Sequence, residues 1–172
     1  LFDWWMGEKK FKKKMDENGE IAKSGNVDDL ILNQSKDNFC INSYEKSLDV
    51  KDFEISFAKG LSFEDGCATL TKFSAYLIAN GINHFNDLSV SKNLISGGGR
   101  KNNFLINSIN EYLNKKITKL EKIDNYGLNG DFIESQAFGF LSIRSFLKLP
   151  ISFPTTTGCK KPTTGGVIVS NY

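Results

Sequence analysis

Three consecutive glycines, Gly97-Gly98-Gly99, are the strongest constraint on how this chain can fold. They follow a short run, Asn93 to Ser96, that favours a β-strand, and they precede a segment from about Asn102 to Asn114 whose apolar spacing favours a helix. Glycine admits positive φ angles and lets a ligand approach the backbone without a Cβ in the way. The N-terminal end of the following helix points its unpaired N–H groups at the loop, which suits a phosphate or another anion.

The glycines match neither of the two common phosphate-binding patterns. They lack the lysine of the Walker loop and the spacing of the Rossmann fingerprint. A glycine-rich turn after a strand is common in proteins of many functions. On these residues alone a plain tight turn is favoured over a nucleotide contact, and both interpretations stay open.

Hydrophobic periodicity predicts a long helix before the glycines. Ser62-Phe63-Glu64-Asp65 has the shape of a capping box, and Gly81 is a typical C-terminal stop. Between them, apolar residues recur at helical spacing. They are Phe63, Cys67, Leu70, Phe73 and Leu77.

Other elements complete the pattern. Helices are predicted over Asp3 to Met15 and from Val27, and residues 37–60 show no sustained period. A strand over Ile117 to Ile123 and a long helix over Asp131 to Leu147 follow the glycines. The order strand, glycines, helix, strand, helix predicts an α/β fold. The last helix is expected to bury Ile133, Ala137, Phe140, Leu141 and Leu147.

Composition excludes several classes of function. A length of 172 residues fits one domain, and a net charge of +2 is too small to indicate a nucleic-acid partner. The basic run Lys9 to Lys14 is interpreted as the solvated face of a helix, with a polyanion site as the alternative.

No apolar run approaches the ~20 residues that span a membrane, and no signal peptide opens the chain. Cys40, Cys67 and Cys159 lack the spacing of a metal site, so we expect reduced thiols and a cytoplasmic protein.

Several short blocks are spread along almost the whole chain. They are Lys46-Ser47-Leu48-Asp49 with Phe53, Leu61-Ser62-Phe63-Glu64-Asp65-Gly66 with Ala68-Thr69-Leu70-Thr71, Gly97-Gly98-Gly99-Arg100 with Asn103, Gly130-Asp131 with Glu134, Gln136-Ala137-Phe138 and Arg144, and Leu149-Pro150 with Ser152-Phe153-Pro154, Thr156-Thr157-Gly158 and Gly165-Gly166. In their order and spacing they resemble the anhydro-N-acetylmuramic acid kinase family.

The resemblance implies a fold and an activity. The fold is a ribonuclease H-like domain of the actin/hexokinase/Hsp70-like superfamily, with a mixed sheet and flanking helices. Residues 1–172 would be the C-terminal domain of a sugar kinase, whose N-terminal domain, phosphate loop and aspartate base lie upstream of Leu1. The activity would be ATP- and Mg²⁺-dependent phosphorylation of 1,6-anhydro-N-acetylmuramic acid with ring opening. The product would be N-acetylmuramic acid 6-phosphate, in cell-wall recycling.

The resemblance also assigns residues. It implies that Gly97, Gly98 and Gly99 form the adenosine-side loop and that Asn103 caps or supports that loop. It implies substrate contacts at Lys46, Ser47, Asp131 and Glu134.

One departure from the family pattern and two alternatives in function accompany these assignments. Val50 stands where the family often has arginine, so any role of that arginine is lost. A homodimer is plausible for the family. The alternatives in function are a non-catalytic interaction module with the same fold, or another sugar or acetate kinase of the superfamily.

Overall fold

The long helix α4 (Phe63–Phe85) is the centre of the fold. Its start is as predicted, because the Asp65 N–H donates to Ser62 Oγ at 3.1 Å. Its predicted end at Gly81 is wrong: the helix continues to Phe85, and Ile82 in this extension packs against a buried cluster. Favourable packing of an extra turn outweighs the low helix propensity of one glycine.

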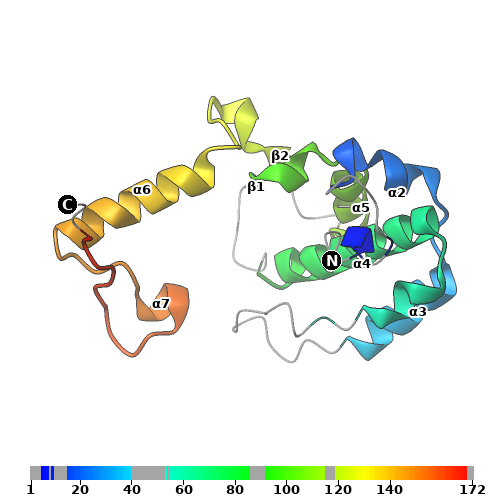
Figure 1. Ribbon diagram of the computed structural model, residues 1–172, viewed down its shortest axis with the longest axis horizontal. Coiled ribbons are helices and arrows are strands. Elements are labelled where there is room, and N and C mark those ends of the chain that lie inside the picture. The colour runs from blue at the N-terminus through cyan, green and yellow to red at the C-terminus, as the bar shows by residue number, and fades with distance from the viewer. Residues whose placement is uncertain are drawn as a thin grey trace.

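The computed structural model describes residues 5–7, 9, 15–39, 53, 55–85, 92–114 and 119–169. Figure 1 shows helices gathered around α4 and one long helix that points away from them. The elements besides α4 are η1 (Glu17–Gly19), α2 (Glu20–Ser24), α3 (Asp29–Asn38), η3 (Ser56–Gly60), β1 (Asn93–Ile95), η5 (Gly98–Lys101), α5 (Asn103–Tyr112), β2 (Leu120–Lys122), η6 (Ile123–Tyr126), α6 (Ile133–Phe146) and α7 (Pro154–Thr157).

Two apolar clusters cover different faces of α4. The first brings Trp5 against the start of the helix, where its Nε1 donates to the Phe63 carbonyl oxygen at 3.0 Å. A Cβ on Gly66 would lie 2.1 Å from the Trp5 ring, so this position of the helix requires glycine. The second cluster packs α4 against α5 through Ala79 and Ile109, which are both fully buried.

The strands β1 and β2 form a parallel pair, with Asn93 opposite Leu120 and Ile95 opposite Lys122. The connection between them contains η5 and α5, so this part of the chain is a β–α–β unit. The predicted α/β class is confirmed in the described residues as helices with a small parallel sheet. Both predicted strands are present in shortened form, and residues 115–118 lie outside the described part.

Helix α6 contradicts the burial predicted for it. It is described throughout, yet it contains no buried residue; Phe140 is 60% exposed and Leu147 is 57% exposed. Figure 1 shows that α6 extends away from the helices around α4. The C-terminal residues that lie beside α6, Ile151 and Gly165 to Ile168, leave these two side chains more than half exposed. Apolar spacing indicates that a face favours burial, but it does not identify the partner that covers it.

The predictions for the first sixty residues are confirmed only in part. Of the helix expected over Asp3 to Met15, the described residues are Trp5–Gly7, Lys9 and Met15, and Met15 is non-helical and 65% exposed. The helix expected from Val27 is α3, which is capped by Asp28 through the Ile31 N–H at 3.0 Å. A helix that was not predicted, α2, has the N–H groups of Ile21 and Ala22 in its first turn bound by the buried carboxylate of Asp16.

Cys67 is fully buried in the core, and its thiol should be unreactive. Burial, with the nearby charge of Asp16, raises the pKa of Cys67 to about 12, so the thiolate is scarce at neutral pH. We expect iodoacetamide at pH 8 to alkylate the partly exposed Cys159 and to leave Cys67 unmodified until the protein is denatured. Peptide mass spectrometry measures both positions in one sample, and rapid modification of Cys67 in the native protein would contradict the expectation.

Candidate functional site

The glycine loop lies directly after β1, at the carboxyl end of the parallel pair. This is the side on which α/β units bind ligands. The chain turns at Gly97, which has φ +77° and ψ 178°, a conformation essentially restricted to glycine. The Gly97 N–H donates to the carbonyl oxygen of Gly130 at 2.9 Å, so the loop is joined to the segment before α6.

The surface above the loop is open. A Cβ added to Gly98 would meet no atom within 4 Å, and one added to Gly99 would meet only Leu105 Cδ2, at 3.8 Å. Both residues are exposed, and neither has a positive φ angle. Protein contacts therefore do not require glycine at these two positions, whereas a ligand seated against the backbone would.

A buried arginine, Arg100, holds the loop through a hydrogen bond to the Gly97 carbonyl oxygen. Arg100 is 4% exposed, and its Nε and Nη2 donate to the two carboxylate oxygens of Asp124 at 2.8 and 3.1 Å. Its Nη1 donates to Asp131 Oδ1 at 2.7 Å and to the Gly97 carbonyl oxygen at 2.9 Å. The guanidinium group can form such paired hydrogen bonds because it is planar and holds its N–H donors in a fixed geometry.

Charge within this cluster is balanced and stays fixed near neutral pH. Asp131 also accepts from Lys101 Nζ at 2.8 Å, so two cations face two carboxylates. The Arg100 guanidinium lowers the pKa of Asp124 to about 2 and, with Lys101, lowers that of Asp131 further. Because both pKa values lie below those of free carboxyl groups, the stabilisation is complete above about pH 4. It is lost only as the pH falls through the folded-state values.

The residue that caps α5 is Asn102. Its Oδ1 accepts from the Leu105 N–H at 2.9 Å. Asn103, which is predicted to cap or support the glycine loop, is the first helical residue and its side chain is exposed; its role toward the loop stays a prediction. Asn102 can act as the cap because the residue before the first turn has an extended backbone, which directs its side chain back to the free N–H groups of the helix.

The structure brings only some of the other predicted site residues to the loop. Asp131 is part of the cluster, through Arg100 and Lys101. Glu134 lies in the first turn of α6 and is exposed. Lys46 and Ser47 lie outside the described residues.

Sequence reasoning missed Arg100 and Asp124 as a pair. Arg100 adjoins the glycines, but nothing local indicates that its side chain turns inward. Asp124 is 24 positions away in the chain. The pairing depends on how β2 and η6 pack beside the loop.

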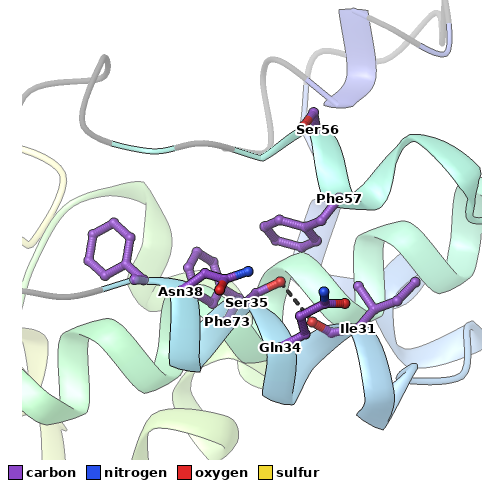
Figure 2. A pocket seen from close by; sticks show the side chains of 8 residues that line it. Ile31, Gln34, Ser35, Asn38, Ser56, Phe57 and Phe73 are labelled. Carbon is purple, nitrogen blue, oxygen red and sulfur yellow. Dashed lines mark hydrogen bonds between the residues drawn. The ribbon is translucent and has the colours of Figure 1, made fainter.

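A separate cavity of about 470 Å³ lies between α3 and η3, with Phe73 of α4 among its lining residues. Figure 2 shows rings of phenylalanine facing the side-chain amides of Gln34 and Asn38, while Ser35 Oγ donates to the Ile31 carbonyl oxygen at 2.7 Å. Its volume is in the range of small-molecule pockets. It shares no lining residue with the glycine loop. Its lining residues are Ile31, Gln34, Ser35, Asn38, Phe39, Ser56, Phe57 and Phe73.

The described ranges contain neither a cluster of metal ligands nor a membrane-spanning helix. There, no group of three or more His, Cys, Asp and Glu side chains is arranged to hold a metal ion. Both oxygens of Asp124 and of Asp131 already accept from cationic groups, which makes these carboxylates poor ligands for Mg²⁺. In the same ranges no helix is both long enough and apolar enough to cross a membrane.

Comparison with known proteins gives a consistent result. The family model described as "Anhydro-N-acetylmuramic acid kinase" matches residues 1–171. The protein of that name from Pelagibacter ubique is 48% identical over 177 residues, which cover 100% of this chain and 47% of the relative. Those from Zymomonas mobilis and Methylorubrum populi are 39% and 36% identical, over 89% and 95% of this chain and 41% and 42% of the relatives. The chain spans about half the length of the curated relatives it matches.

Proposed function

This chain belongs to the anhydro-N-acetylmuramic acid kinase family, and from that membership we propose that it is the adenosine-side half of a sugar kinase. The complete enzyme would use ATP to phosphorylate 1,6-anhydro-N-acetylmuramic acid with opening of the anhydro ring. The product would be N-acetylmuramic acid 6-phosphate, in cell-wall recycling. The observation that carries the proposal is the family match over residues 1–171, which includes the glycine loop.

The nucleotide would lie against Gly98 and Gly99, with Asn103 at the edge of the site. The open space above these two glycines supports this placement, because a ligand can approach their backbone N–H groups directly. ATP would supply the transferred phosphoryl group, and positioning together with charge neutralisation would dominate catalysis. Mg²⁺ would be held mainly by phosphate oxygens and water.

The described residues would belong to the C-terminal domain of a longer protein with a ribonuclease H-like fold. Helix α6 supports this proposal, because three of its large apolar side chains are each about 60% exposed: Phe138, Phe140 and Ile143. Several large apolar side chains exposed on one helix favour an interface there. The N-terminal half of the longer protein, which would also carry the aspartate base, is the proposed cover.

Substrate contacts are proposed at Lys46, Ser47, Asp131 and Glu134. Glu134 is the best placed of the described residues, since it is exposed on the first turn of α6, just beyond the cluster that supports the loop. Asp131 would act mainly through Arg100 and Lys101, which occupy its two oxygens. The enzyme is also proposed to be cytoplasmic and homodimeric, by analogy with the family.

The test compares two polypeptides: the longer protein encoded upstream and through this chain, and the 172-residue chain alone. We expect the longer protein to release ADP in the presence of 1,6-anhydro-N-acetylmuramic acid, and the chain alone to release none, because the base lies in the other half. ADP release is followed with a coupled assay. Sugar-dependent activity of the chain alone would contradict the proposed division of the site.

A non-catalytic interaction module is the alternative from a different class. The upstream sequence separates the two, because a kinase requires a glycine-rich phosphate loop and an aspartate base there. A longer protein that binds ATP but does not release ADP with this sugar would support the module, or another kinase of the superfamily.

A further inference from the structure

Arg100 directs its side chain into the protein, away from the open surface of the glycine loop. Its guanidinium makes four hydrogen bonds: two to Asp124, one to Asp131 and one to the Gly97 carbonyl oxygen. Four of its five N–H donors are therefore occupied. An arginine beside an anion-binding loop is usually expected to bind the anion, but this one has little donor capacity left for a ligand.

The fit around the guanidinium is close on the backbone side as well. A Cβ on Gly130 would lie 2.3 Å from Arg100 Nε, so the arginine requires glycine at this position. Gly130 in turn accepts from the Gly97 N–H at 2.9 Å and donates its own N–H to Asp124 Oδ1 at 3.3 Å. Both polar groups of the Gly97 backbone are thus held, one by Gly130 and one by Arg100.

We propose that Arg100 is a positioning residue for the nucleotide: it fixes the Gly97 carbonyl and thereby the direction of the Gly98 and Gly99 N–H groups, without touching the ligand. The inference rests on the proposed function, which places ATP against these glycines. Asp124 takes part in this positioning, because its carboxylate binds the Arg100 guanidinium through both oxygens. The low pKa of Asp124 keeps the Arg100–Asp124 pair charged from pH 5 to pH 9. The pair should therefore add no pH dependence to the KM for ATP in that range.

The test is Arg100→Lys in the longer protein, because lysine keeps the charge but cannot form the fork of hydrogen bonds. We expect the KM for ATP to rise about tenfold, with kcat and the KM for the sugar changed by less than about twofold. Asp124→Asn should act in the same direction. The double variant should be about as impaired as the stronger single variant, because both changes disrupt one unit.

Arg144→Lys is the matched control, since these are the two arginines of the chain and Arg144 Nε bonds only to the Pro150 carbonyl oxygen among the described residues. It should leave the KM for ATP unchanged. A large fall in kcat with Arg100→Lys would mean that the arginine touches the reacting phosphate and would overturn the positioning role. An unchanged KM for ATP would overturn it too.

Two further outcomes keep the inference separate from the proposed function. If Gly98→Ala raises the KM for ATP and Arg100→Lys does not, only the positioning role fails. If neither variant changes it, the nucleotide placement fails. If circular dichroism shows that Arg100→Lys does not fold, Asp124→Asn is the remaining test. An unchanged KM for ATP in that variant contradicts the inference, and a rise in the KM for ATP alone supports it.

Discussion

Replacing Gly98 with alanine should weaken ATP binding at least about tenfold while leaving the fold intact. A Cβ at Gly98 meets no protein atom within 4 Å, and its φ angle is not positive. Alanine there should even stabilise the protein by up to about 1 kcal/mol through the unfolded state. The methyl group would instead project into the space proposed for the nucleotide. Isothermal titration with ATP and a thermal melt of the longer protein measure the two effects.

The same substitution distinguishes the two interpretations that the glycines alone leave open. If Gly97 to Gly99 form only a tight turn, Gly98→Ala leaves the ATP affinity unchanged while the small rise in stability is still seen, which would contradict the proposal. Gly97→Ala is the matched comparison. At φ +77° and ψ 178° an alanine would cost about 1–3 kcal/mol of backbone strain, so this variant should lose stability as well as affinity.

Phe73→Ala should be the most destabilising single truncation in α4. Its ring is 1% exposed and meets the rings of Phe39 and Phe57 edge-on at 5.7 and 5.4 Å between centroids. Removing it would extend the cavity that it lines in Figure 2. We expect a loss of about 3–5 kcal/mol in the free energy of unfolding, a large part of the total for an ordinary domain.

Ile78→Ala is the control for Phe73→Ala. It lies on the same helix but is 44% exposed, so its truncation should cost less than about 1 kcal/mol. Urea unfolding followed by circular dichroism gives both values. Equal losses at the two positions would contradict the assignment of Phe73 to the core.

Local signals in the sequence were sufficient for the elements that depend on neighbouring residues. The Ser62 cap and the apolar stripe through Phe73 predicted α4, and the glycines after Ile95 predicted the strand–loop–helix order. Each of these follows from backbone chemistry or periodicity within a few residues.

Features that depend on tertiary contacts could not be predicted in this way. The link between Arg100 and Asp124 is invisible without the fold, although it holds the candidate site together. The apolar residues of α6 led to a prediction of burial that the structure contradicts, because no residue of the helix is buried even where C-terminal residues lie against it. The cap of α5 was also not identified from the sequence: it is Asn102, whose Oδ1 accepts from the Leu105 N–H.

Helix α6 has a mechanical consequence that follows from where it begins. Its first residue, Ile133, comes shortly after Asp131, whose carboxylate is bonded to Arg100 and, through it, to the Gly97 carbonyl. A displacement at the start of α6 would therefore reach the backbone of the glycine loop through one carboxylate and one guanidinium, those of Asp131 and Arg100.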